Sequence, residues 1–131
     1  MVAIFIIAHA PLATALHQVA EHVLGPVKAL TAIDIVPNQC AADCAQAMAE
    51  SIASADQGDG VLVLTDLPGA SPSNICVSSA NYVRSQGIPC VVLSGVNPAM
   101  LLRAISYQHV ALEEVAAQAL IGANQSAIRV D

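Results

Sequence analysis

The chain has 131 residues, of which 56% are hydrophobic and 2% aromatic, and it carries ten Asp and Glu residues against four Lys and Arg residues. The resulting formal net charge of −6 makes nucleic acid and anionic lipid poor partners. The mean hydropathy of +0.64 does not indicate a membrane span, because the apolar runs fall far short of the ~20 residues that a spanning helix needs. We expect one domain over residues 1–131, with a core of small aliphatic side chains.

Segments rich in β-branched residues alternate with segments of helical pattern along the chain. The predicted strands are Val2–Ala8, Thr31–Val36, Val61–Thr65, Cys90–Ser94 and, at the end, Ala127–Val130. The predicted helices are Leu12–Leu24, Ala41–Ala55, Ser71–Ser85, Pro98–Ile105 and Leu112–Ile121. Short strands that are apolar on both faces are typical of a parallel sheet covered by helices. The alternation therefore predicts a doubly wound α/β domain with a mostly parallel sheet in flavodoxin-like order.

The two ends of the chain bear on its assembly and location. The last predicted strand, Ala127–Val130, is short enough to lie on an edge of the sheet, and it could equally pair with another subunit. At the other end, no basic residue precedes Lys28, and the first apolar run lacks the layout of a signal peptide. We therefore expect a cytoplasmic location.

The four cysteines do not form a C-x-x-C pair. Cys40 and Cys44 are four residues apart, a spacing that could place two metal ligands on one helical face. No neighbouring pair of histidines completes a zinc set, so we expect buried or unreactive thiols and no metal site.

Ligands of open α/β sheets bind outside the carboxyl ends of the strands, where the strand order reverses. The first strand runs into His9, the second into Pro37 and Asn38, the third into Asp66, and the fourth into Asn97. His9 is the only histidine at such a strand end. A neutral imidazole there is either a nucleophile that forms a covalent intermediate or a packed side chain that bridges two loops.

Two further features near the carboxyl ends of the strands favour the interpretation of His9 as a nucleophile. Asp66 is either a loop aspartate or the acceptor of a hydrogen bond from one ring nitrogen of His9, which would leave the other nitrogen free. Ser71 is predicted to be the N-cap of a helix, because the proline after it suits the first helical position. Asn97 is predicted to cap the fourth helix in the same way. The terminus at Gly69, Ala70 and Ser71 is either an ordinary capped helix or a binding site for a phosphoryl group.

Two other functions of doubly wound domains fit this sequence poorly. A receiver domain needs an acidic pair near the end of strand one for Mg²⁺ and a lysine late in the sheet, whereas here strand one ends in His9 and Lys28 is the sole lysine. A dinucleotide-binding domain needs a glycine-rich turn after a strand, and neither G-x-G-x-x-G nor G-x-x-x-x-G-K occurs there. We expect no nucleotide, Mg²⁺ or other cofactor.

Three stretches resemble, in order, the IIA domain of the mannose/fructose class of the bacterial phosphoenolpyruvate-dependent sugar phosphotransferase system. They are I-F-I-I-A-H-A-P, V-L-V-L-T-D-L-P-G-A-S-P-S-N and S-G-V-N-P-A-M-L-L. The resemblance implies that His9 accepts a phosphoryl group from the phosphocarrier HPr and passes it to a histidine of a IIB domain. It also implies that Asp66 and Ser71 are the matching site residues, and that a homodimer exchanges its C-terminal strands.

The chain departs from the family pattern around the site. The family usually has glycine after the histidine, and an aromatic residue and a second glycine in the middle motif, where this chain has Ala10, Pro68 and Ala70. These differences imply an altered surface for docking of the donor. Because no IIB domain is fused within the sequence, we expect a separate recipient, which is either a IIB-type acceptor or a regulatory target.

Overall fold

The computed structural model describes residues 1–37 and 41–131, so Asn38 and Cys40 lie outside the described residues. The strands are β1 (Ala3–His9), β2 (Leu30–Ile35), β3 (Val61–Leu64) and β4 (Cys90–Leu93). The helices are α1 (Leu12–Leu24), α2 (Ala41–Ala55), α3 (Ser71–Ser85), α4 (Pro98–Ser106) and α5 (Leu112–Ser126). None of the described helices is long and apolar enough to cross a membrane.

The described strands form one parallel sheet in the order β2-β1-β3-β4. In this sheet Phe5 of β1 lies beside Thr31 of β2 on one side and Val63 of β3 on the other. The order reverses at β1, because the chain first moves to β2 and then returns past β1 to β3. This confirms the prediction of a doubly wound α/β domain with flavodoxin-like order.

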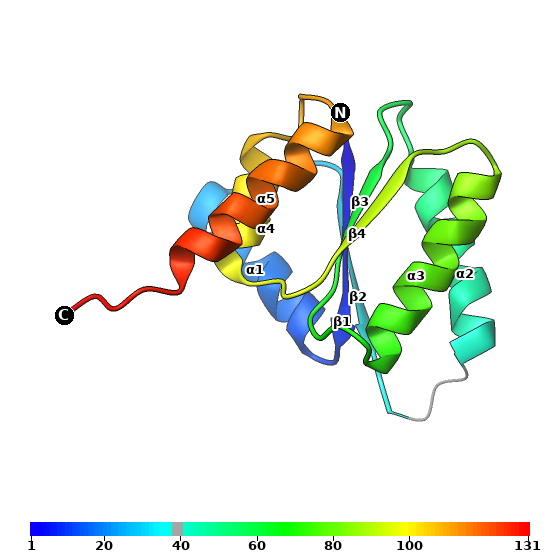
Figure 1. Ribbon diagram of the computed structural model, residues 1–131, viewed down its shortest axis with the longest axis horizontal. Coiled ribbons are helices and arrows are strands. Elements are labelled where there is room, and N and C mark those ends of the chain that lie inside the picture. Colours follow the sequence, from blue (N-terminus) through cyan, green and yellow to red (C-terminus); the bar gives the residue numbers. More distant parts are fainter. Residues whose placement is uncertain (38–40) are drawn as a thin grey trace.

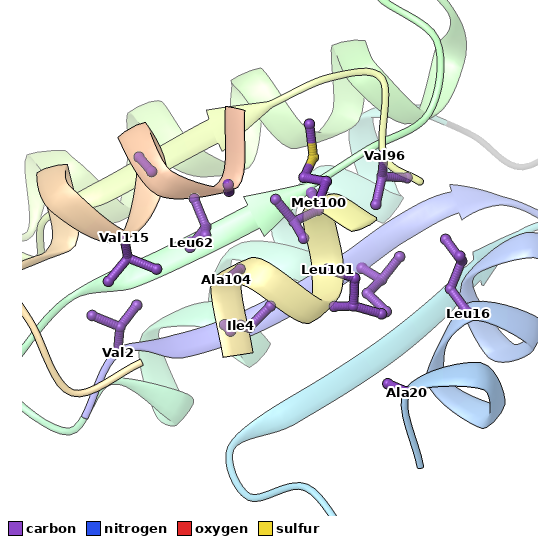
Figure 2. Packing of buried hydrophobic residues seen from close by; sticks show 14 of the residues in the cluster. Val2, Ile4, Leu16, Ala20, Leu62, Val96, Met100, Leu101, Ala104 and Val115 are labelled. Atoms are coloured by element: carbon purple, nitrogen blue, oxygen red, sulfur yellow. The ribbon is translucent and has the colours of Figure 1, made fainter. Parts of the chain in front are cut away.

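Helices cover both faces of the sheet, with α1, α4 and α5 on one side and α2 and α3 on the other (Figure 1). Successive residues of a strand point to opposite faces, so Ile4 packs into the first layer and Phe5 into the second. Figure 2 shows the first layer, in which Ile4 and Leu62 of the sheet and Leu101 of α4 belong to one buried cluster. Burying each such aliphatic side chain contributes about 1.5–3 kcal/mol, which explains a stable core with few aromatic residues.

The end of the chain differs from the prediction. The last helix continues to Ser126 instead of ending near Gly122. Gly122 lies inside the helix and packs closely against α4: a Cβ atom there would lie 2.8 Å from Cβ of Arg103. Residues 127–131 form no strand in the single chain, and they extend away from α5 (Figure 1) with Ile128 67% and Val130 90% exposed. Strand exchange between subunits stays a prediction.

Candidate functional site

His9 is the last residue of β1, the strand at which the sheet order reverses. Its side chain is 49% exposed, whereas the six preceding residues of the strand are buried. The chain then turns directly into α1, and the backbone N–H of Ala10 donates to the carbonyl oxygen of Ile35 on β2 at 2.9 Å. Strand β1 and its contact with β2 therefore hold the backbone of His9 while the imidazole stays accessible.

Asp66 follows β3, the neighbour of β1, and its side chain is only 11% exposed. Its Oδ2 atom lies 2.7 Å from Nδ1 of His9 and accepts the backbone N–H of His9 at 3.1 Å. Its Oδ1 atom accepts the backbone N–H of Leu67 at 2.8 Å. Burial alone would raise the pKa of Asp66, but the hydrogen bonds from the His9 ring and from both backbone N–H groups outweigh it and hold that pKa below 3.8.

This pairing sets the chemistry of the imidazole. An ionised Asp66 can only accept a hydrogen bond, so Nδ1 of His9 carries the ring proton. In the neutral ring, Nε2 of His9 then keeps its lone pair and can act as a nucleophile. The structure thus brings together the histidine and the aspartate that the sequence predicted.

Backbone hydrogen bonds fix the loop that carries Asp66. The N–H of Gly95 donates to the carbonyl oxygen of Asp66 at 2.7 Å, and the N–H of Val96 donates to that of Thr65 at 3.0 Å. Gly95 has a φ of +80°, a conformation that glycine adopts without strain. The loops after β3 and β4 therefore support each other, and Asp66 is held in place by its backbone as well as by its side chain.

Helix α3 begins beside this loop, and its N-cap differs from the prediction. The N-cap residue is Ala70, in an extended conformation, and Ser71 is already the first helical residue. The predicted N-cap role of Ser71 is therefore wrong, and no side chain caps the helix. Gly69, with a φ of +79°, makes the turn into Ala70. The exposed Ser71 and the first-turn N–H groups of Ser71 and Ser73, since Pro72 has none, form a terminus that favours an anion.

Two other helix termini at this edge, those of α1 and α4, are occupied by acceptors. The side chain of Asn97 caps α4 by accepting the N–H of Met100 at 2.9 Å, as the sequence predicted. The carboxylate of Asp34 accepts the N–H of Thr14 in the first turn of α1 at 3.1 Å. Among α1, α3 and α4, only α3 therefore presents an N-terminus that no side chain occupies.

A cavity of about 300 Å³ lies beside His9. Its walls include His9 and Ala10, Ile35 at the end of β2 with the following residues Val36 and Pro37, and Ser71 at the start of α3. The cavity therefore joins the imidazole to the uncapped helix terminus. Gly69 and Ala70, predicted to bind phosphate, do not line the cavity and instead precede Ser71 in the chain.

The cysteines stand apart from this site. Cys76 and Cys90 are buried, and burial raises the pKa of Cys76 to about 12 and that of Cys90 to about 11. The prediction of buried thiols is confirmed for these two, whereas Cys44 is half-buried and Cys40 lies outside the described residues. Within residues 1–37 and 41–131, no group of three or more His, Cys, Asp or Glu residues could hold a metal ion.

Comparison with known families decides the identity of the chain. Residues 3–120 match the family EIIA-man, described as the PTS system fructose IIA component. The chain belongs to this family. The match covers both the His9 and the Asp66 segments, and it confirms the family that the three sequence motifs resembled. Components of this IIA family are phosphotransferase components of sugar uptake systems. No curated protein matches the chain.

Solved structures share the fold of this IIA chain. The phosphotransferase system component EIIA from Streptococcus agalactiae is similar with a TM-score of 0.86 and 23% identity, over 98% of this chain and 97% of that one. The mannose/sorbose specific IIA subunit from Enterococcus faecalis has a TM-score of 0.85 and 18% identity, over 99% and 95%. A sigma-54 interaction domain protein from Enterococcus faecalis has a TM-score of 0.77 and 19% identity, over 95% and 91%.

Proposed function

We propose that this chain is a phosphocarrier, which accepts a phosphoryl group on Nε2 of His9 and passes it to a second protein. The observation that carries the proposal is the 2.7 Å contact between Nδ1 of His9 and Oδ2 of Asp66. It ties the ring proton to Nδ1 and leaves the accessible Nε2 as the nucleophilic nitrogen. Membership of the IIA family supports the same role.

The uncapped N-terminus of α3 supports the proposal that a phosphoryl group binds beside His9. Phosphoryl transfer depends mainly on positioning and on electrostatic stabilisation of the phosphoryl oxygens. Helix N-termini bind such anions through free N–H groups and the helix dipole. In the proposal, the backbone at Ser71, preceded by Gly69 and Ala70, holds the phosphoryl oxygens.

In this proposal the HPr-like donor carries its phosphoryl group on an imidazole nitrogen, so the transfer exchanges one phosphorus–nitrogen bond for another. The lone pair of Nε2 attacks phosphorus in line, and the bond to the donor's imidazole breaks with its electron pair staying on the donor. The proton on Nδ1 of His9 stays in its hydrogen bond to Asp66, whose carboxylate stabilises the positive charge that develops on the ring. The second transfer, from His9 to the acceptor, reverses these roles.

The donor in this proposal is an HPr-like phosphocarrier, and the acceptor is a separate IIB-type protein, both acting in the cytoplasm. The family supports these partners, since IIA components act within the phosphotransferase system. Neither transfer step requires a metal or an organic cofactor, because each reactant is an imidazole or its phosphorylated form.

Label transfer tests the proposal. Purified protein is incubated with labelled phosphoenolpyruvate, the first enzyme of the system and HPr, and label is followed on the chain. We expect an acid-labile, base-stable label that is absent from His9→Ala and present in His109→Ala, a control that removes an exposed histidine remote from the site. Label on His9→Ala at the wild-type level would contradict the assignment of His9 as the phosphoacceptor.

The proposal includes a homodimer that exchanges the C-terminal segment. The exposed Ile128 and Val130 leave an apolar side of the segment without cover in the single chain, and β4 is an edge strand that has its described partner, β3, on one side only. Pairing of residues 127–130 with β4 of a second copy would cover both the apolar side of the segment and the open edge of β4. A chain truncated after Ser126 should sediment as a monomer while the full chain sediments as a dimer; equal masses would refute the exchange.

A second candidate function is regulation of a partner by the phosphorylation state of His9. The similarity to a sigma-54 interaction domain protein motivates this candidate, since that protein has the same fold and is named for an interaction with sigma-54. Pull-downs with phosphorylated and unphosphorylated protein would separate the two functions. Identical partners in both states would count against regulation.

A further inference from the structure

The carboxylate of Asp34, on β2, binds the first turn of α1. Its Oδ1 atom accepts the backbone N–H of Thr14 at 3.1 Å, and its Oδ2 atom accepts the hydroxyl of the same residue. We propose that Asp34 is a positioning residue for His9, which fixes the start of α1 and thereby the turn that carries the imidazole. This inference rests on the proposed function of His9 as phosphoacceptor.

Helix α1 needs an acceptor from outside its own sequence. Its N-cap residue is Pro11, which makes no side-chain hydrogen bond to the helix. The first N–H groups of a helix lack partners within it, and an N-cap Asp, Asn, Ser or Thr usually satisfies one of them. Asp34 takes this role from the neighbouring strand, and its negative charge is favourable at the positive end of the helix.

The connection between His9 and helix α1 is very short. Only Ala10 and Pro11 separate His9 from Leu12, the first residue of the helix. Strand β2 holds this turn at both ends, through the bond from the N–H of Ala10 to the carbonyl oxygen of Ile35 and through the contact between Asp34 and Thr14. A shift of α1 therefore strains the turn that follows His9 and competes with the contacts that align its ring with Asp66.

Asp34 acts through the backbone and not on the reacting group. His9 lies beside Ile35 in the register of the sheet, and Ile35 packs on the side of α2 and α3. Asp34, the preceding residue of β2, points to the opposite face, where it meets α1. It does not line the cavity beside His9. By occupying the terminus of α1, Asp34 makes that terminus less available to a phosphoryl group than the uncapped terminus of α3.

Two variants and a matched control test the role of Asp34. In Asp34→Ala both contacts to Thr14 are lost, whereas Asp34→Asn keeps an oxygen acceptor for the backbone N–H. The control is Asp56→Asn, because Oδ1 of Asp56 also accepts two backbone N–H groups, each at 3.0 Å, in the loop that enters β3 at the opposite edge of the sheet.

The first readout is transfer from the HPr-like donor. We expect Asp34→Ala to lower kcat about tenfold with KM unchanged, because misalignment of the nucleophile costs rate more than binding. Asp34→Asn should restore part of the rate, and Asp56→Asn should transfer at the wild-type rate. If Asp34 had only a structural role, Asp34→Ala would lower the unfolding midpoint without changing kcat for the folded protein. If Asp34→Ala does not fold, Thr14→Val removes only the hydroxyl contact and should show a smaller fall in kcat.

The second readout does not depend on phosphorylation. Proton–nitrogen correlation spectra of the His9 ring report which nitrogen carries the proton, and in the wild type we expect this to be Nδ1. Asp34→Ala should shift part of the population to the Nε2-protonated ring. Wild-type kcat together with an unchanged ring spectrum would overturn the role of Asp34. If the wild type accepts no label, the proposed function fails, and the ring spectra alone then support or overturn the positioning role.

Discussion

One oxygen atom of Asp66 holds both the ring and the backbone of His9: Oδ2 lies 2.7 Å from Nδ1 and 3.1 Å from the backbone nitrogen. Rotation of the imidazole about its side-chain bonds would break the first contact while the second keeps the residue in place. The carboxylate itself is fixed by the N–H of Leu67. The pair therefore defines one orientation of the nucleophile before any partner binds.

Replacing Asp66 by asparagine should slow phosphorylation of His9. The amide side chain has nearly the same shape but can donate as well as accept, so it no longer fixes the proton on Nδ1. We expect the initial rate of label transfer from HPr to fall at least about 10- to 100-fold, the loss found when the hydrogen-bond partner of a metal-ligating histidine is removed. Asp56→Asn, remote from the site, is the control. Equal rates for wild type and Asp66→Asn would contradict the orienting role.

The depressed pKa of Asp66 links this contact to stability in acid. Its pKa in the folded protein lies below the ordinary value of 3.8, so the unfolded chain binds the proton more tightly. The contact therefore contributes stability above pH 3.8, and this contribution is lost as the pH falls through the lower pKa of the folded state. Urea unfolding across this range should show a steeper acid loss for wild type than for Asp66→Asn. Parallel profiles would show that the carboxylate is not stabilised in the folded protein.

The sequence predicts well what depends on local pattern. Strand ends follow from short apolar runs, and the topology of parallel sheets brings these ends together, so the approach of His9 and Asp66 could be predicted. The N-cap of α3 could not be predicted, because it depends on the backbone conformation that Gly69 and Ala70 adopt. The cap is therefore Ala70 and not Ser71. Asp34 was missed since its partner Thr14 lies 20 residues away, in another element, and no local motif marks such a contact.

Gln108 should contribute strongly to stability and not to phosphorylation. It is 4% exposed, and its Nε2 atom donates to the carbonyl oxygens of Val2 at 3.1 Å and Lys28 at 3.0 Å, joining the start of β1 to the segment before β2. Gln108→Leu leaves these oxygens without that donor, which should cost about 1–3 kcal/mol of unfolding free energy in urea. The exposed Gln18→Leu is the control. A loss confined to the phosphorylation rate would contradict this role.

Two glycines in one loop separate backbone strain from steric conflict. Gly58 and Gly60 have φ values of +97° and +86°, so alanine at either position adopts an unfavourable backbone conformation. A Cβ atom at Gly60 would also lie 2.9 Å from Cδ2 of Leu112 and 2.9 Å from the carbonyl oxygen of Pro89, whereas one at Gly58 meets nothing within 4 Å. The backbone oxygen cannot move aside without disturbing its hydrogen bond from the N–H of Val61. Gly60→Ala should therefore lower the unfolding free energy by about 1–3 kcal/mol more than Gly58→Ala, as overpacking does elsewhere. Equal losses in urea unfolding would mean that the loop relaxes freely around the added methyl group.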